Sequence, residues 1–419
     1  MESNKIITGI DIGSSKVKVT VGMPNPNGKL TILSIQEVVS EGMSNTGIVN
    51  VGKTVESIMT AVERASKEAG VSIASANVNI PGRHTTITSH TNCIIRENPE
   101  EEVVAKDMAK LHQTMYKTNA GAGHKILDII PQAYFLDYEE NIKDPIGMSG
   151  TELGGTFYVI SAPNNVVNNI HKCMSKANIS VDHLIFPALA SSLSVLTEEE
   201  KKVGVCLLDL GASTTTLSIF QNNSLQHLAL VPTGGDVLDK DIAHAFMLTE
   251  AQAEEIKTRL GSAYEDEGKN EIVVVPNLGN RSEKEIFLRI VDRIIEARIQ
   301  ESIGFVKREI LGSKFQHKIT AGIVITGGAS QLKGLDKFLS YTTSYETRLG
   351  YPYGLLRGEE SKLPGIEYAT SIGLVLAGYK SIGQPEKIYK KKTELKFKIA
   401  PRAKKKSSGI WRIFRGIFD

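Results

Sequence analysis

The pattern of apolar and polar residues at the start of the chain predicts three consecutive strands. Ile6–Ile12 form an apolar run, Lys16–Gly22 alternate polar and apolar side chains, and Lys29–Ile35 follow a turn rich in Pro, Asn and Gly. Alternation with a period of two is typical of a strand that buries one face. The loop between the first two strands reads Asp11-Ile12-Gly13-Ser14-Ser15.

The same pattern returns in the second half of the chain. An apolar run at Val203–Leu210 ends in Asp209-Leu210-Gly211-Ala212-Ser213, and two further strands are predicted at Thr214–Phe220 and Leu225–Val231. Each half therefore opens with a strand, an Asp-x-Gly-small-Ser loop and two more strands. We expect an α/β protein built from two similar halves.

Helices with an apolar stripe follow both strand sets. In the first half Val55, Ile58, Met59, Val62 and Ala65 recur at helical spacing, and Gly70 is placed to end the helix. A helix over Thr249–Leu260, ending at Gly261, is the counterpart in the second half. Each half then supplies another strand and helix, predicted at Val181–Phe186 with Ala188–Leu196 and at Ile319–Ile325 with Gln331–Leu339.

Two segments interrupt this symmetry and are predicted to be inserted lobes, at about His84–Ser161 and Asp239–Glu309. The first is expected to hold a helix capped by Asn98, with Pro99 in its first turn. Its predicted apolar face consists of Val104, Met108, Leu111 and Met115, and its predicted strands are Lys125–Ile130, Gln132–Tyr138 and Thr156–Ser161. The second lobe is expected to hold a strand near Glu271–Val275 and a long helix over Ser282–Leu311.

Charge is distributed unevenly between the body of the chain and its end. The 419 residues are 41% apolar and carry a net charge of +2, which suits a folded protein with a sizeable core. From Lys387 onward, twelve Lys or Arg stand against Glu394 and Asp419, so this tail carries +10 and the remainder −8. An acidic body with a basic tail indicates an anionic partner for the tail alone.

Neither end of the sequence contains a hydrophobic segment long enough to span a bilayer. The N-terminus leads into Ile6–Ile12 without a signal-peptide pattern, so we expect a cytoplasmic location. The three cysteines, Cys93, Cys173 and Cys206, are widely spaced in apolar surroundings. Buried free thiols are favoured over a disulfide framework or a zinc site.

The two repeated loops have the composition of a phosphate-binding site. Asp11 and Asp209 each end an apolar strand, and a carboxylate there can hold Mg²⁺ directly or through water. The small residues that follow can cradle phosphate oxygens with their N–H and hydroxyl groups: Gly13, Ser14, Ser15 and Lys16 in the first loop, and Gly211, Ala212, Ser213 and Thr214 in the second. One such loop alone would be a common hairpin; its recurrence favours a shared site.

Two further elements suit a nucleotide. The turn Gly327-Gly328-Ala329 follows an apolar strand, as does Gly234-Gly235, and both permit close approach of a ligand to the backbone. Glu254 and Lys257 lie on neighbouring turns of a predicted helix, where they could hold a ribose or form only a surface pair.

The last eleven residues predict an amphipathic helix. At about 100° per residue, one arc is entirely apolar, comprising Ile410, Trp411, Ile413, Phe414, Ile417 and Phe418, while Arg412 and Arg415 lie on the other side. A basic linker precedes it, which favours insertion into an anionic membrane over docking on the protein's own body. Nucleic acid is the alternative partner for the basic run, and the aromatic amphipath that follows argues against it.

Several segments, in their order along the chain, resemble those of the actin, Hsp70 and sugar-kinase ATPase superfamily, and within it the FtsA family of bacterial cell-division proteins. The superfamily resemblance rests on the two Asp-x-Gly loops, Glu254-x-x-Lys257 and Thr326-Gly327-Gly328-Ala329. The narrower resemblance rests on Ile130-Pro131-Gln132-Ala133-Tyr134, Asp137-Tyr138, Asn141–Gly147, Leu184–Phe186, Leu189–Ser192 and Ala321–Ala329.

The resemblance implies an actin-like duplicated ATPase fold with two inserted subdomains and a C-terminal amphipathic helix. The implied cofactors are ATP (or ADP) and Mg²⁺. The implied segments are 1–83, 162–197 and 364–384 (subdomain 1A), 84–161 (1C), 198–238 and 310–363 (2A), 239–309 (2B), 385–408 (basic linker) and 409–419 (membrane-targeting helix).

The implied function is in cell division, at the cytoplasmic face of the bacterial inner membrane. Proteins of this family polymerise, tether the tubulin-like FtsZ and help to recruit later division proteins, which are expected to bind subdomain 1C. The FtsZ C-terminal peptide binds subdomain 2B. In this chain Ile286, Ile290, Ile294 and Ala297 are expected to pack inward, which leaves Arg293, Arg298 and Glu301 for the exposed face. Arg298 and Glu301 are the candidate contacts for that peptide, or else only solvate a surface helix.

The chain departs from its relatives at two places. Hydrolytic members of the superfamily carry Glu before the proline that is here Pro187, whereas this chain has Phe186, which cannot position a water. Weak or absent ATPase activity is implied. Ala212 and Ser213 stand at positions that are usually glycine-like, and Thr216 stands where an Asp often occurs.

A pilus adaptor like PilM and an ATP-driven enzyme remain the alternative functions.

Overall fold

The computed structural model describes residues 6–24, 30–44, 47–80, 83, 85–118, 120–264, 271–276, 282–353, 355–357 and 364–382. The predicted linker over 385–408 and the amphipathic helix over 409–419 lie outside these residues. Within the described part of the chain, no helix is both long and apolar enough to cross a bilayer.

The first sheet begins with the predicted three-stranded segment. Strands β1, β2 and β3 pair antiparallel in chain order, and β6 pairs parallel with β1 on its other side. The full order is β11-β6-β1-β2-β3-β19. The strands are β1 (Ile7–Ile12), β2 (Lys16–Pro24), β3 (Leu30–Val39), β6 (Ser75–Asn79), β11 (Ser180–Ile185) and β19 (Leu355–Arg357).

The second sheet repeats this arrangement. Strands β12, β13 and β14 pair antiparallel in chain order, and β17 pairs parallel with β12, in the order β14-β13-β12-β17-β18. The strands are β12 (Val205–Leu210), β13 (Thr215–Gln221), β14 (Ser224–Val231), β17 (Ile323–Thr326) and β18 (Thr347–Leu349). The predicted duplication is confirmed. Val203 is not in the strand, however, because it ends helix α5 (Glu198–Val203), which Gly204 terminates.

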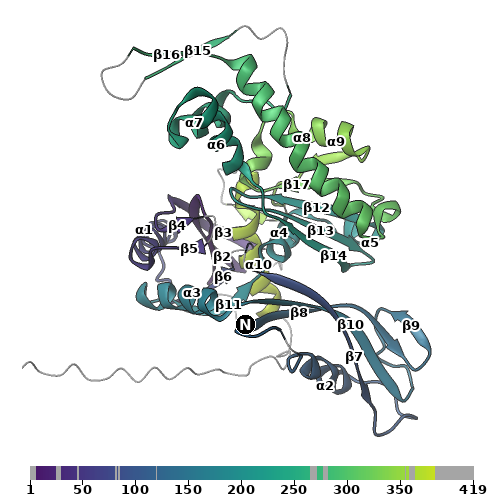
Figure 1. Ribbon diagram of the computed structural model, residues 1–419. Helices are drawn as coiled ribbons and strands as arrows, with labels where there is room; N and C mark the ends of the chain where they lie inside the picture. Colours follow the sequence, from purple (N-terminus) through teal and green to yellow (C-terminus); the bar gives the residue numbers. More distant parts are fainter. Residues whose placement is uncertain are drawn as a thin grey trace, which may run out of the picture. The chain divides into compact units, whose positions relative to one another are not determined.

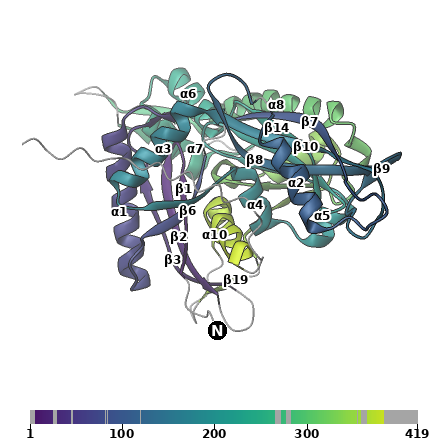
Figure 2. The ribbon, with the colours of Figure 1, turned by 90° about the horizontal axis from the view of Figure 1, so that it is seen from below.

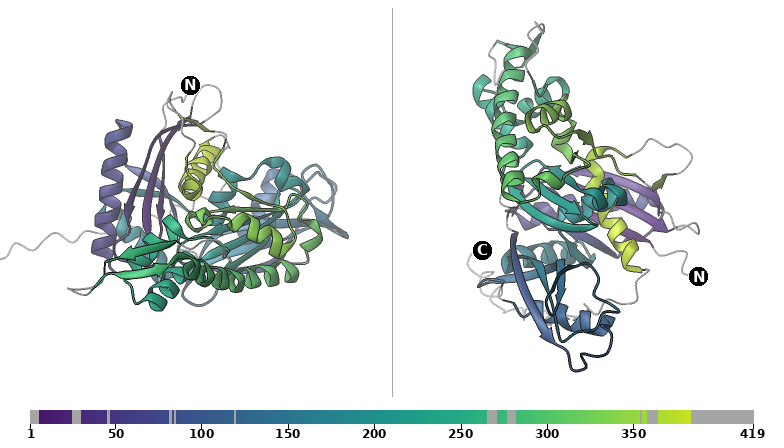
Figure 3. Two further views of the ribbon diagram at one scale, coloured as in Figure 1. Left: turned by 90° about the horizontal axis from the view of Figure 1, so that it is seen from above. Right: turned by 90° about the vertical axis from the view of Figure 1, so that its right-hand side faces the viewer.

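Helices cover both faces of the first sheet. Figures 2 and 3 show α1 (Val51–Ala69) on one side of the sheet and α10 (Ala369–Ile382) on the other. Helix α3 (Asn164–Lys176) packs beside α1, and α4 (Pro187–Val195) packs against α10. Asn50 caps the start of α1 and Gly70 ends it with φ of 66°. The predicted inward position of Met59 is wrong, since 48% of it is exposed.

The second sheet is covered by α8 (Leu288–Gly312) and α9 (Leu335–Thr343), with α6 (Gly235–Phe246) and α7 (Glu250–Leu260) beyond them. Figure 1 shows α8 lying alongside the sheet. Thr249 caps α7 as predicted. The helix predicted over Gln331–Leu339 begins only at Leu335, because a 3-10 turn occupies Gly328–Gln331. The strand predicted over Ile319–Ile325 is likewise shorter.

The first insertion is a four-stranded sheet with one helix, which we call the lobe. Its strand order is β7-β10-β8-β9, and α2 (Ala105–Met115) packs on it through Leu111 and Met115. The strands are β7 (Thr86–Ile95), β8 (His124–Leu136), β9 (Glu139–Ile142) and β10 (Glu152–Pro163). The two strands predicted over Lys125–Ile130 and Gln132–Tyr138 are therefore one strand that continues through Pro131.

The prediction that Asn98 caps α2 is wrong, because the helix starts after Val104. The residues before it form a turn, in which the N–H of Glu101 donates to the carbonyl of Asn98, and tertiary contacts hold them out of the helix. The Arg96 guanidinium donates to the carbonyls of Glu101 and Gly150, and Val103 exchanges backbone hydrogen bonds with 147–148. Val104 is half exposed as a result.

The second insertion contains the hairpin β15 (Ile272–Val275) and β16 (Lys284–Phe287). The long helix predicted from Ser282 therefore begins at Leu288, since the preceding residues pair as a strand. Its buried face is also different from the prediction: Val291, Ile295, Ile299 and Ile303 are buried, whereas Ile290 and Ala297 are exposed. Ile286 is buried, but from β16.

The remaining elements are short. They are the two-residue strands β4 (Met43–Ser44) and β5 (Gly47–Ile48), and the 3-10 turns η2 (Gln316–Lys318), η3 (Gly328–Gln331) and η4 (Ile366–Tyr368).

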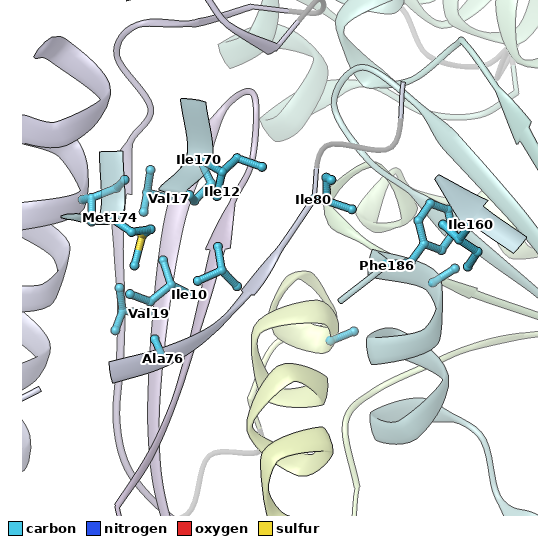
Figure 4. Close-up of a cluster of buried hydrophobic side chains, with 14 of the residues drawn as sticks. Ile10, Ile12, Val17, Val19, Ala76, Ile80, Ile160, Ile170, Met174 and Phe186 are labelled. Carbon is cyan, nitrogen blue, oxygen red and sulfur yellow. The ribbon is translucent and has the colours of Figure 1, made fainter. Parts of the chain in front are cut away.

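One hydrophobic core extends from the first sheet towards the second. Figure 4 shows Ile10, Val19 and Met174 in the layer between β1–β2 and the helices, and Phe186 beside Ile160. The same cluster includes Leu207 and Phe220 of the second sheet. Cys173 and Cys206 are buried free thiols as predicted, but Cys93 is only partly buried.

Candidate functional site

The two repeated loops have the same local geometry and touch each other. In the first, the N–H of Gly13 donates to the carbonyl of Lys16 at 3.1 Å; in the second, Gly211 donates to Thr214 at 2.9 Å. The hydroxyl of Ser213 donates to that of Ser14 at 2.6 Å. This contact joins the ends of β12–β13 and β1–β2, so the duplicated loops face a common space.

Asp11 is partly buried near the end of β1 and is held by a neighbouring strand. The amide of Asn79 donates to its carboxylate at 2.6 Å, while the Asn79 side-chain oxygen accepts from the N–H of Ile12 at 2.7 Å. Burial raises the pKa of Asp11 to about 6; Lys18 lowers it and Asp209 raises it further. A nearby cation would favour the ionised form of a carboxylate whose pKa is raised in this way.

Asp209 occupies the matching position in the second half. Its carboxylate accepts from the hydroxyl of Ser191 at 2.5 Å and from that of Thr370 at 3.4 Å. Burial raises the pKa of Asp209 too, against the effects of those hydroxyls and Lys18.

Lys18 was missed in the sequence analysis. It pairs directly with Asp11 across β1 and β2, and its ammonium donates to the carbonyl of Glu367 at 2.5 Å. It is the cation that acts on both carboxylates. The alternation of Lys16 and Lys18 along β2 was visible, but only the strand register shows that Lys18 lies opposite Asp11.

The Lys16 side chain is engaged away from the loop, and the backbone of Ser15 is tied to the residue that follows β3. The ammonium of Lys16 pairs with Glu37 at 2.5 Å, and the carbonyl of Ser15 accepts from the N–H of Ser40. Lys16 lines a cavity of about 530 Å³ between β3 and α1, together with Arg64. Within the loop, Lys16 takes part through its backbone carbonyl, which accepts from the N–H of Gly13.

The third glycine-rich turn lies against Asp209. Gly327 has φ of 89°, and a side chain there would meet the Leu210 carbonyl at 2.5 Å and the Asp209 carboxylate at 2.6 Å. A side chain at Gly328, in contrast, would meet no atom within 4 Å. The turn therefore packs tightly on one side and opens onto free space on the other.

The Gly234-Gly235 turn packs on the second loop and is held by α7. Gly235 donates to the carbonyl of Gly211 at 3.0 Å, and Lys257 donates to the carbonyl of Gly235 at 3.0 Å. A side chain on Gly235 would lie 3.3 Å from that of Ala329. These contacts bring the second and third glycine-rich segments together beside Lys257.

The predicted pair of Glu254 and Lys257 does not form. Lys257 instead pairs with Asp239 on α6 at 2.7 Å, and Glu254 is exposed. One oxygen of Asp239 and both oxygens of Asp236 are buried without a hydrogen-bond partner. Unmatched acceptors at this point suit a ligand that can donate hydrogen bonds, such as a ribose hydroxyl.

Phe186 contributes nothing polar to this region. It precedes Pro187 at the start of α4 and is buried in the apolar core with Ile160 (Figure 4). The sequence predicts that this position offers no hydrogen-bond acceptor. In the structure the aromatic ring there is packed into the core.

The candidate peptide-binding residues, Arg298 and Glu301, are distant in sequence from the two repeated loops. Arg298 donates to both carboxylate oxygens of Asp241 on α6, at 2.5 and 3.0 Å, and also pairs with Glu301. Arg298 is partly exposed and Glu301 is exposed. The candidate membrane-binding residues from Ile410 to Phe418 lie outside the described residues.

Comparison with protein families finds two matches. Residues 206–373 match the model described as Cell division protein FtsA, and residues 82–161 match the SHS2 domain inserted in FTSA. The Cell division protein FtsA of Pseudomonas aeruginosa is 35% identical over 380 residues, which is 90% of this chain and 90% of the relative. That of Escherichia coli K12 is 32% identical over 385 residues, covering 90% and 91%.

Solved structures share the fold at low identity. A PilM-PilN type IV pilus biogenesis complex matches with a TM-score of 0.64 and 16% identity, over 90% of this chain and 99% of the other. MreB5 of Spiroplasma citri bound to ADP matches with a TM-score of 0.53 and 12% identity, over 91% and 100%. These likenesses establish an actin-like fold.

Proposed function

The chain belongs to the FtsA family of cell-division proteins, and on that premise we propose that it binds ATP or ADP with Mg²⁺ between its two halves. The two duplicated loops meet at Ser14 and Ser213, with a partly buried carboxylate behind each, and this geometry supports the proposal. MreB5, an actin-like neighbour, is described as bound to ADP.

The residues present fit a magnesium nucleotide. Mg²⁺ in such sites is held by one or two carboxylates, with phosphate and water as the other ligands. Asp11 and Asp209 supply those carboxylates, and among the described residues no larger group of acidic, histidine or cysteine ligands occurs. When bound, the ion would neutralise charge between the carboxylates and the phosphates.

The glycine-rich segments would receive the rest of the nucleotide. The N–H and hydroxyl groups of 13–15 and 211–214 are proposed to hold the phosphates, with Lys18 beside them. The open side of Gly328 and the Gly234-Gly235 turn are proposed to face the nucleoside. Asp239 and Lys257 place a carboxylate oxygen and an ammonium where a ribose could bind, with Glu254 at the margin.

We propose that nucleotide binding, rather than turnover, is the working state. Positioning a water for attack needs an acceptor within hydrogen-bond reach, and Phe186 is a buried aromatic ring. Activity as a fast ATP-driven enzyme is therefore the less favoured alternative.

We further propose that the tail attaches the protein to the cytoplasmic face of the inner membrane at the division site. The support is the sequence of the tail, with its apolar arc and ten bases in Lys387–Lys406. Apolar insertion and attraction to anionic lipids act together, and each basic residue near the surface adds about 1 kcal/mol.

The partners proposed for this protein are the FtsZ C-terminal peptide, further copies of itself and later division proteins. The peptide is assigned to the second insertion, near Arg298 and Glu301, and the later proteins to the lobe. The alternative of a PilM-like pilus adaptor rests on shared fold alone. We propose the same subdomain boundaries as those expected from the sequence.

Titration calorimetry with Mg-ATP and Mg-ADP tests the central proposal directly. Saturable binding at one site per chain is the expected result, and it should weaken when Mg²⁺ is removed with a chelator. Lack of binding by a protein with an intact circular-dichroism spectrum would contradict the assignment of the loops.

A further inference from the structure

Two side chains of the lobe donate hydrogen bonds to one backbone carbonyl of the second half of the protein. The carbonyl of Gln226, on β14, accepts from the side-chain amide of Gln132 at 3.3 Å and from the hydroxyl of Tyr158 at 3.0 Å. Gln132 lies on β8 and Tyr158 on β10. One acceptor therefore ties two strands of the lobe to the edge strand of the second sheet.

Both glutamines are the extra residues of β-bulges. On β8 the pairing with β10 passes from Pro131 to Ala133 and omits Gln132; on β14 the pairing with β13 passes from Leu225 to His227 and omits Gln226. A bulged residue leaves the ladder and can direct its groups elsewhere. Pro131 lacks an N–H, which helps to explain the interruption in β8.

The contact is supported on each side by a further polar group. Within the lobe, the hydroxyl of Ser89 donates to the side-chain oxygen of Gln132 at 3.0 Å, which orients its amide towards Gln226. Next to Gln226, His227 lies 3.5 Å from the carboxylate of Glu309 on α8. The acceptor strand therefore lies next to the long helix of the second half.

Apolar packing beneath this contact cannot by itself fix the orientation of the lobe. Ile130 and Tyr158 pack against the cluster that contains Phe220 and Leu228 of the second sheet. Hydrophobic contact is non-directional, and packed elements can slide past one another by small shear movements. Directional hydrogen bonds at one carbonyl can select a single position.

We propose that Gln132, Tyr158 and the carbonyl of Gln226 form a latch that holds the lobe in one orientation on the second half. Release of the latch lets the lobe slide on its apolar base. Because β14 belongs to the half that contains Asp209, rotation of that half on nucleotide binding would strain the latch. That last consequence rests on the proposed nucleotide site, whereas the latch itself does not.

Distance measurement between two spin labels tests the latch without any nucleotide. Suitable sites are Tyr138→Cys in the lobe, which is fully exposed, and Tyr341→Cys on α9, which is 89% exposed. Cys93→Ser removes the one partly exposed native thiol. We expect one narrow distance distribution by double electron–electron resonance, and its loss through broadening or a shift when Gln132→Ala and Tyr158→Phe are combined.

Tyr134→Phe is the matched control, since the Tyr134 hydroxyl bonds His112 within the lobe at 3.0 Å and should leave the distance unchanged. Tyr158→Phe alone removes one oxygen and keeps the ring, so it remains informative if the double variant fails to fold. An unchanged distribution in Tyr158→Phe and in a folded double variant would overturn the latch. Because no nucleotide is present, that result would leave the proposed nucleotide site unaffected.

Discussion

The guanidinium of Arg298 binds both carboxylate oxygens of Asp241, and so connects α8 to α6 within the protein. A test of the proposed peptide contact must therefore distinguish loss of this internal ion pair from loss of the contact with the peptide. A partly exposed guanidinium that is already held by a carboxylate can still accept a second acidic partner on its open side.

Arg298→Glu should therefore weaken binding of an FtsZ C-terminal peptide at least tenfold, or about 1.4 kcal/mol. Asp241→Ala is the control, because it breaks the same internal pair and leaves the guanidinium in place. Fluorescence anisotropy with a labelled peptide measures both variants. Equal losses in the two would show that Arg298 only positions α8, and equal affinity of Arg298→Glu and the parent would end the assignment.

Gly328→Leu should abolish nucleotide binding and leave the fold intact. A Cβ added at Gly328 meets no protein atom within 4 Å, and the rest of the leucine side chain would occupy the space proposed for the nucleoside. Gly304→Leu on α8 is matched, since a side chain there also meets no neighbour. Calorimetry with Mg-ATP should show binding in the control alone; retained affinity in Gly328→Leu would remove the third turn from the site.

Asp11→Asn should stabilise the free protein at pH 7 while it weakens Mg-dependent nucleotide binding. Burial raises the pKa of Asp11 in the folded state to about 6, above its usual value of 3.8. Between these values the folded state binds more protons than the unfolded one, so this group's contribution to stability rises as pH falls from 7 to 5.

Removing the ionisable group should add up to about 3 kcal/mol to the free energy of unfolding at pH 7, since one pKa unit is worth 1.36 kcal/mol. The gain should be smaller at pH 5. Urea denaturation at both pH values measures this difference. A variant that is less stable than the parent at pH 7 would show that the Asp11 carboxylate is not disfavoured by its burial.

ATP turnover should remain well below ordinary enzyme rates of about 1 per second or more. Phe186 is buried and offers no acceptor for an attacking water. A higher ATP concentration should therefore not raise the turnover rate to that of an ordinary enzyme. A coupled phosphate-release assay with the purified protein, run with and without vesicles and FtsZ, measures the rate. Sustained turnover at enzyme-like rates would favour the ATP-driven enzyme instead.

Deletion of residues 409–419 should release the protein from anionic vesicles. Trp411→Glu with Phe414→Glu should do the same by placing charge on the apolar arc, whereas neutralising the linker lysines should reduce binding and its salt dependence without abolishing it. Vesicle flotation measures all three. Continued flotation of the deletion variant would exclude the tail as the anchor.

The sequence by itself determined the duplication and most of the local structure. Periodicity in Ile6–Ile35 and again in Val203–Val231 favours strands with a buried face. Gly70 ends a helix through its left-handed backbone, and Thr249 begins one through its side-chain hydroxyl. The glycine-rich turns were recognisable for the same reason. Such signals lie within a few residues of one another and need no partner elsewhere in the chain.

Only the tertiary structure decided which distant residues meet. Lys18 faces Asp11 because of strand register, and Lys257 pairs with Asp239 in place of Glu254 because α6 packs against α7. Asn98 does not start α2, since Arg96 and the 147–150 segment hold residues 98–103 in a turn that lies outside the helix. Contacts of this kind depend on how elements pack, and packing overrides local preference wherever it buries more surface or satisfies more polar groups.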